Sequence, residues 1–214
     1  MLATLGAQVD PKHTAVIVVD VQNDFCARGG ALDARGNDVS EVQVMVPVLA
    51  SFIEEARRAG ARIIWVRMLN TDWTTSPSWR FRLHRADRQQ MAPICAPDGW
   101  GQEYYQIRPA TGEIEVFKHR YSAFVGTNLD LILRSMEIRT LIMTGVATNV
   151  CVESTARDGY MMDYYVVFIK DCTAAFTSEG HEATLKNIAD YFGIVASSAE
   201  VIEAWKTLNY SQRC

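Results

Sequence analysis

The feature that most constrains the fold is a regular alternation of two kinds of segment from residue 14 onward. Nearly continuous apolar runs, rich in β-branched residues, cover residues 14–22, 61–69, 114–119, 140–146 and 164–172. Segments with apolar positions at helical spacing cover residues 38–60, 127–138, 149–159 and 178–193. Apolar runs of this kind are typical of parallel strands buried on both faces. The pattern therefore predicts an α/β fold with an open, mostly parallel, doubly wound sheet and helices on both faces.

The chain length of 214 residues fits a single domain, predicted over residues 1–214. Gly60, Gly159 and Gly193 stand where C-terminal helix caps are expected. Residues 70–113 contain no predicted element and are rich in Trp, Arg, Pro and Gly. Because a loop of this length in a compact domain usually has a function, we expect an active-site or interface loop there.

Composition limits the classes of partner. The formal charge of −4 is spread over mixed acidic and basic residues without a basic stripe, which argues against nucleic acid and against a membrane surface. No apolar run approaches the roughly 20 residues that span a bilayer, and no secretory leader pattern begins the chain, so a cytoplasmic location is expected. A small-molecule partner is favoured.

Cysteine usage points to neither a disulfide framework nor a metal site. The five cysteines are odd in number and lack zinc-ligand spacing, so no metal is expected. The chain also lacks the glycine-rich phosphate motifs of dinucleotide and nucleoside triphosphate sites, and we expect no cofactor.

Three polar residues fall at or just beyond the carboxyl ends of predicted strands, where sites in such folds lie: Asp20, Lys118 and Cys151. A carboxylate inside an apolar run needs a partner, and Lys118 is the natural candidate. Two interpretations remain open for these residues taken singly. Asp20 and Lys118 can be a structural ion pair, and a lone cysteine is often a small buried apolar group.

The setting of Cys151 favours a nucleophile. Thr148 and Asn149 are candidate caps for the helix that follows, which would put the thiol in its first turn and lower its pKa. Lys118 would act in the same direction. Asp20 could accept the thiol proton and return it to a leaving amine, while the helix start supplies N–H donors for an oxyanion.

Three blocks, "DVQNDF" (20–25), "KHRYSAF" (118–124) and "GVATNVCVESTARDGY" (145–160), resemble the signature blocks of the isochorismatase-like cysteine hydrolases, in the same order. The resemblance implies a catalytic triad of Asp20, Lys118 and Cys151, with an acyl-enzyme on the cysteine. It also implies a cis peptide bond between Val146 and Ala147, and an oxyanion hole formed by the N–H groups of Ala147 and Cys151. Members are usually homo-oligomers, so a tetramer or dimer is expected.

Departures from the family pattern limit the reactions that are expected for this chain. Metal-binding nicotinamidases carry an Asp-x-His element where this chain has Asp72 without a histidine, so a metal and nicotinamidase activity are not expected. Cys151 favours cleavage of a C–N bond in a small linear amide. The block around it looks most like those of ureidoacrylate, biuret and N-carbamoyl amino acid hydrolases. The alternatives are an isochorismatase-type ether hydrolase that uses Asp20 without the thiol, and a non-catalytic binding domain on the same fold.

Substrate-binding residues are less well defined. Asn23, Phe25 and Tyr121 flank the proposed triad in sequence and are predicted to line the pocket. Arg85, one of four arginines at residues 80–88, is a candidate for binding a substrate carboxylate. Asp24 is expected to cap or pair with a neighbouring group, and the remaining cysteines are expected to be structural or incidental.

Overall fold

The computed structural model, which describes residues 1–85 and 93–211, contains one parallel sheet of six strands in the order β3-β2-β1-β4-β5-β6. The strands are β1 Thr14–Val19, β2 Arg62–Met68, β3 Ile114–Lys118, β4 Thr140–Val146, β5 Tyr165–Ala174 and β6 Ile194–Ala196. All five strand pairs are parallel, which confirms the predicted class of fold. The sheet order reverses between β1 and β4, at the point where α/β sheets hold their sites.

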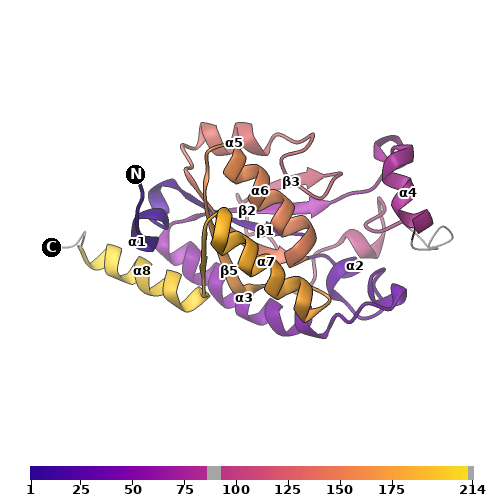
Figure 1. Cartoon of the computed structure of the whole chain (residues 1–214), viewed down its shortest axis with the longest axis horizontal. Coiled ribbons are helices and arrows are strands. Elements are labelled where there is room, and N and C mark those ends of the chain that lie inside the picture. Colours follow the sequence, from indigo (N-terminus) through magenta and orange to yellow (C-terminus); the bar gives the residue numbers. More distant parts are fainter. Residues whose placement is uncertain (86–92, 212–214) are drawn as a thin grey trace.

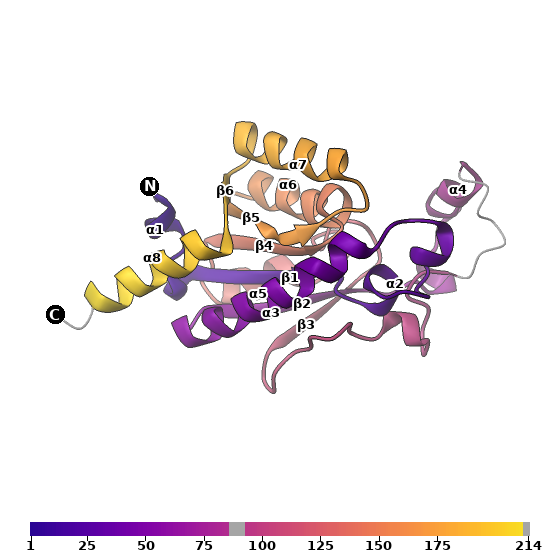
Figure 2. The same ribbon diagram turned by 90° about the horizontal axis from the view of Figure 1, so that it is seen from below.

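Helices cover both faces of the sheet. The main ones are α3 Ser40–Ala59, α5 Leu129–Ser135, α6 Glu153–Met161, α7 Ser178–Tyr191 and α8 Ser198–Ser211, with short helices α1 Leu5–Gln8 and α2 Asn23–Cys26 near the N-terminus. Figure 2 shows α6 and α7 on one side of the sheet and α3 and α8 on the other. Alternate side chains of β1 enter two separate cores: Val16 and Val18 pack toward α3, and Ile17 and Val19 pack toward α5 and α6. This two-sided burial explains why the strand sequences are continuously apolar.

Two elements in the C-terminal part were not predicted. β6 has only three residues, two of them half-buried, so its apolar signal is weak. Helix α8 buries Val201 and Trp205, one helical turn apart, and the indole of Trp205 stacks on Phe52 of α3 with ring centroids 5.3 Å apart. Their spacing matches a helix, but two positions alone are a short pattern.

The predicted glycine caps have different outcomes. Gly60 ends α3 in the left-handed conformation, with φ of 83°, as expected for a C-cap. Gly159 lies inside α6, so the prediction of a cap there was wrong. A Cβ on Gly159 would lie 2.6 Å from a methyl group of Leu141, which shows that close packing of α6 on the sheet requires this glycine. Gly193 follows the end of α7 without a left-handed φ, and its approach to the Val166 carbonyl leaves no room for a Cβ.

The segment 70–113 is more regular than the sequence predicted. It contains α4 Pro77–Arg85 and the single 3₁₀ turns Asp72–Thr74 and Trp100–Gln102. Proline at the first position of α4 suits a helix start, a signal that the sequence interpretation did not use. Helix α4 projects from the main body in both views (Figures 1 and 2).

Candidate active site

The carboxyl ends of the strands bring three side chains together. Asp20 follows β1 directly, Lys118 is the last residue of β3, and Cys151 lies in the turn after β4. The Lys118 ammonium is 2.7 Å from a carboxylate oxygen of Asp20, and both side chains are fully buried. Cys151 is 4% exposed, and its thiol interacts electrostatically with both Asp20 and Lys118. The arrangement matches the grouping that the sequence predicted.

The backbone fixes the ion pair. Asp20 has a φ of 52°, a left-handed conformation that is uncommon outside glycine and that aspartate tolerates better than most residues. Its N–H donates to the carbonyl of Val66 at 2.8 Å, which holds the end of β1 against β2. The Lys118 ammonium also donates to the carbonyl of Arg120 at 3.1 Å. An uncommon backbone angle held by these contacts orients the carboxylate toward the lysine.

Burial dominates the electrostatics. It raises the pKa of the Asp20 carboxyl, because the Lys118 cation only partly opposes the loss of water. Burial lowers the pKa of Lys118, but the Asp20 carboxylate and Cys151 raise it by more, so its net direction is upward. Burial also raises the pKa of the Cys151 thiol to about 12, with Lys118 acting against the shift. The expected lowering of this pKa was therefore wrong, since desolvation exceeds the effect of the nearby cation.

The turn that carries Cys151 is a single π-helical turn, Thr148–Val152, which continues into α6. The Val146–Ala147 peptide bond before it is cis. Neither Thr148 nor Asn149 caps the turn with its side chain, so that prediction was wrong. Instead, the hydroxyl of Thr148 hydrogen-bonds with Nδ1 of His181 at 2.9 Å.

A buried threonine connects the Cys151 turn to the loop after Lys118. The Thr155 hydroxyl donates to the carbonyl of Cys151 at 2.7 Å and accepts from the N–H of Ala123 at 3.0 Å. Both bonds are buried, and a buried hydrogen bond between two segments restricts their relative movement. The sequence interpretation did not identify Thr155, because its role depends on a contact across 32 residues.

Gly145, two residues before the Ala147 position, permits the close approach of β4 to β1. Its φ is 102°, and a Cβ there would lie 2.1 Å from the carbonyl oxygen of Val19. Any other residue would separate the end of β1, where Asp20 begins, from the end of β4, where the Cys151 turn begins.

The predicted substrate-binding residues lie in varied settings. Asn23 is 7% exposed and its side-chain amide donates to the carbonyl of Trp100 at 3.0 Å. Phe25, also 7% exposed, belongs to the core on the α3 face. Tyr121 is 37% exposed and lies against Trp79, with ring centroids 4.7 Å apart. Arg85 ends α4, and its side chain lies outside the described residues.

Asp24 has a structural role, as the sequence interpretation expected. Its carboxylate accepts from the N–H groups of Ala31 at 3.0 Å and Cys95 at 2.6 Å. The thiols of Cys26, Cys95 and Cys172 are buried and free, and burial raises the pKa of each. Cys214 lies outside the described residues.

Two features are absent from residues 1–85 and 93–211: a metal-ligand cluster and a helix that could span a membrane. No cluster of three or more His, Cys, Asp and Glu side chains suited to a metal occurs among them. The carboxylate of Asp72 is fully exposed, at the limit of ion-pair distance from Arg80. No helix within this part of the chain is both long and apolar enough to cross a membrane.

Comparison with known proteins gives concordant results. A family model described as "Isochorismatase domain" matches residues 14–200. Ureidoacrylate amidohydrolase RutB of Caulobacter segnis is 36% identical over 204 residues, which cover 90% of this chain and 85% of that protein. The crystal structure of a cysteine hydrolase from Pseudomonas syringae pv. phaseolicola superposes with a TM-score of 0.82 at 31% identity, covering 94% of this chain and 95% of that one. N-carbamoylsarcosine amidase from Thermoplasma acidophilum is similar at a TM-score of 0.69 and 27% identity, over 86% of this chain and 96% of that one.

Proposed function

Because the chain belongs to the isochorismatase family and is an amidohydrolase of that family, we propose that it cleaves a C–N bond of a small ureido or carbamoyl compound with Cys151 as nucleophile. The observation that carries this proposal is the buried ion pair of Asp20 and Lys118, which lies within hydrogen-bonding reach of the thiol. A base, a cation and a nucleophile in one buried site are the groups that acyl transfer requires.

In the proposed first step, the Cys151 sulfur attacks the substrate carbonyl carbon while Asp20 takes the thiol proton. A base whose pKa is raised by burial holds a proton more readily than an ordinary aspartate, so it suits this transfer. The carbonyl oxygen becomes an oxyanion, for which the N–H groups of Ala147 and Cys151 are the proposed donors. The C–N bond then breaks, and the amine leaves with the proton from Asp20.

In the second step, water attacks the thioester after giving a proton to Asp20. The C–S bond breaks, the acid product leaves, and the sulfur recovers the proton from Asp20. A ureido substrate that leaves its carbamoyl group on the sulfur releases carbamate in this step. Lys118 remains a cation throughout, which stabilises the carboxylate each time Asp20 loses its proton.

The substrate class rests on similarity. The Caulobacter relative is named for ureidoacrylate and the Thermoplasma structure for N-carbamoylsarcosine, and both compounds contain a carbamoyl carbonyl bonded to nitrogen. Asn23, Phe25 and Tyr121 remain the proposed pocket residues, with Arg85 proposed to bind a substrate carboxylate. A guanidinium binds a carboxylate through two parallel hydrogen bonds, which suits an anionic substrate.

The test of this function combines ammonia or amine release with detection of the acyl-enzyme. Purified protein is assayed with ureidoacrylate, biuret, N-carbamoyl amino acids and simple amides, and mass spectrometry is used to find an adduct on the Cys151 peptide. Cys151→Ala should abolish turnover, whereas Cys172→Ala, a matched change of another buried thiol, should retain it. Full activity in the Cys151→Ala protein would eliminate the thiol as nucleophile, whereas no release of ammonia or amine from any of these amides by the unsubstituted protein would favour the ether hydrolase.

We also propose that the protein forms a homodimer or homotetramer. Trp73, Phe81 and Trp100 are 85%, 58% and 53% exposed in the isolated chain, and large exposed aromatic groups often lie in interfaces. Light scattering on the purified protein tests this directly, and a monomer at micromolar concentration would contradict it.

A further inference from the structure

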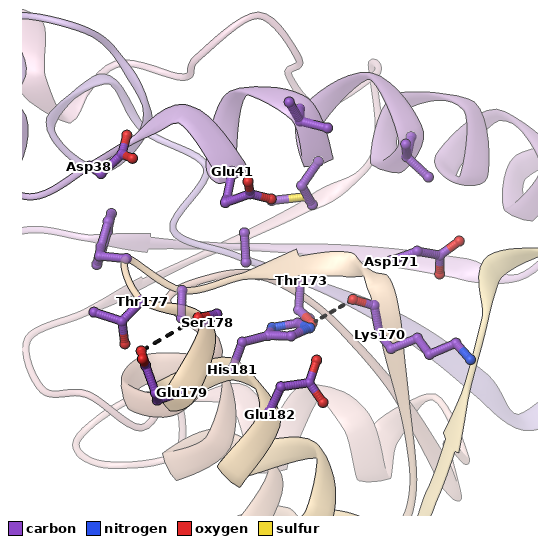
Figure 3. A pocket seen from close by; sticks show the side chains of 16 residues that line it. Asp38, Glu41, Lys170, Asp171, Thr173, Thr177, Ser178, Glu179, His181 and Glu182 are labelled. Atoms are coloured by element: carbon purple, nitrogen blue, oxygen red, sulfur yellow. Dashed lines mark hydrogen bonds between the residues drawn. The ribbon is translucent and has the colours of Figure 1, made fainter.

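A groove of about 700 Å³ lies between α3 and the start of α7, close to the carboxyl end of β5. Figure 3 shows His181 reaching from α7 into this region, with Glu41 and Asp38 on the opposite side. Val44 and Val48 of α3 contribute an apolar part of the wall. The imidazole of His181 is therefore open to the groove on one side.

On its other side, His181 contacts the turn that carries Cys151. Its Nδ1 is 2.9 Å from the hydroxyl oxygen of Thr148, a fully buried side chain at the first position of the turn. Burial lowers the pKa of His181, with Glu182 and Glu41 acting in the opposite direction. The ring is thus neutral near pH 7. A neutral imidazole and a hydroxyl can hydrogen-bond in either direction.

Other residues on the same face of α7 also contact the Cys151 turn and the start of α6. A Cβ on Gly180 would lie 2.6 Å from the side-chain nitrogen of Asn149, so the first turn of α7 packs directly on the Cys151 turn. One turn later, the Thr184 hydroxyl donates to Glu153 at 2.6 Å. Of these contacts, the hydrogen bond of His181 is the one made to Thr148, the residue that directly follows Ala147.

We propose that His181 is a positioning residue for the nucleophile turn, acting through the hydroxyl of Thr148. The hydrogen bond fixes Thr148, and thereby the adjacent Ala147 N–H and the thiol of Cys151, relative to Asp20. This inference rests on the proposed function, because it assigns a role within that reaction. A small displacement of reacting groups costs a large factor in rate, so loss of one hydrogen bond at this position has a kinetic effect.

The test compares variants that keep or remove this hydrogen bond. His181→Asn places an amide near the position of Nδ1 and should retain kcat, whereas His181→Leu fills the space without a hydrogen bond and should lower kcat about tenfold with less change in KM. Thr148→Val should lower kcat by a similar factor. The double variant His181→Leu with Thr148→Val should be no slower than either single variant, because both remove the same bond.

The groove provides a second readout. His181→Gly leaves a space beside the groove, so free imidazole added to this variant should restore a measurable part of kcat. Thr184→Val is the matched control: it removes another hydrogen bond of the same helix face and should lower thermal stability while kcat stays unchanged.

A third arm needs no substrate and separates this inference from the proposed function. Alkylation of Cys151 by iodoacetamide should slow about threefold or more in His181→Leu, because the thiol moves relative to Lys118, whose cation opposes the rise in its pKa, and it should stay unchanged in Thr184→Val. Equal kcat and equal alkylation in His181→Leu and the unsubstituted protein would overturn the inference. Equal losses in the Asn and Leu variants, or multiplied losses in the double variant, would also overturn it. If no amide is hydrolysed by any form, the proposed function fails, and alkylation alone decides the role of His181.

Discussion

Replacement of Lys118 by methionine should cost more stability than removal of any surface charge in this protein. The change keeps the length and the apolar stem of the side chain but removes the ammonium that lies 2.7 Å from Asp20. Both side chains are fully buried, so no water can replace the lost partner of the carboxylate. Breaking a buried pair in this way typically costs about 3–5 kcal/mol in free energy of unfolding.

The matched control is Lys186→Met. Lys186 forms an ion pair with Asp190 at 2.5 Å, but the two side chains are 76% and 40% exposed. A surface pair of this kind contributes about 0.5 kcal/mol or less. With a urea dependence of about 2–3 kcal/mol per molar, Lys118→Met should shift the unfolding midpoint down by about 1–2 M and Lys186→Met by less than about 0.3 M.

The loss in Lys118→Met should also depend on pH. Without the lysine, burial raises the pKa of Asp20 further in the folded state, while the unfolded value stays near its ordinary level. A group whose folded pKa is raised stabilises the protein below the unfolded pKa, and this contribution is lost as pH rises through the folded pKa. The deficit of the variant should therefore be smallest near pH 5 and grow toward pH 8.

Urea titrations at pH 5 and pH 8, with the fluorescence of the buried Trp65 and Trp205 as probe, give both quantities. A second substitution, Asp20→Asn, added to Lys118→Met should recover part of the lost stability, since it removes the uncompensated charge. Equal midpoints for Lys118→Met and Lys186→Met at pH 8 would refute the reasoning, because they would mean that the buried carboxylate needs no partner.

Three further predictions follow from single contacts. Alkylation of Cys151 in the free protein should rise about tenfold per pH unit between pH 7 and 10, because burial raises its pKa to about 12, and a plateau near pH 7 would contradict this. Glu113→Gln should cost about 1–3 kcal/mol at pH 7, since the carboxylate accepts from Arg57 at 2.7 and 2.8 Å. Burial raises the pKa of Glu113, but the hydrogen bonds from Arg57, Ala110 and Trp65, together with the Arg57 charge, lower it by more. The stability that Glu113 provides is therefore present above about pH 4.5 and lost as the pH falls below this, and acid titration of the variant should lack that loss. Gly145→Ala should cost at least about 3 kcal/mol or prevent folding, because its Cβ would lie 2.1 Å from the Val19 carbonyl oxygen, and a change of less than about 1 kcal/mol in a urea titration would contradict the close approach.

The strands were predictable because burial on both faces leaves a signal in every residue. β1 and β4 each consist of fully buried positions, and their sequences contain no charged residue that interrupts the apolar pattern. β6 lies at the edge of the sheet and has one fully buried residue. Its sequence therefore lacks the continuous apolar run that predicts a buried strand. Helix α4 projects from the body, and among its residues 77–81 only Trp79 packs against a core, so the periodicity on which helix prediction depends is weak there.

The grouping of the site was predictable for a related reason. Asp20 and Lys118 interrupt or end apolar strands, and the topology of a parallel sheet brings such positions to one edge. Thr155 and His181 were not predictable, because each acts through a partner more than 30 residues away and neither stands out in its own segment. Their roles require the packing of α6 and α7, which the local sequence does not specify.

The direction of the thiol pKa alters how the proposed reaction must start. At a pKa of about 12, a thiolate at pH 7 would cost about 7 kcal/mol before any bond formed, so a resting thiolate prepared by the helix start alone is not available. In the proposed reaction, the proton therefore passes to Asp20 as the sulfur approaches the carbonyl. Asp20 suits this transfer because burial raises its pKa, and Lys118 keeps the carboxylate ionised and ready to accept. In the proposed reaction, alignment of the thiol with Asp20 determines the rate, so we expect two hydrogen bonds to matter for the chemistry: that of Thr155 to the Cys151 carbonyl and that of Thr148 to His181 of α7.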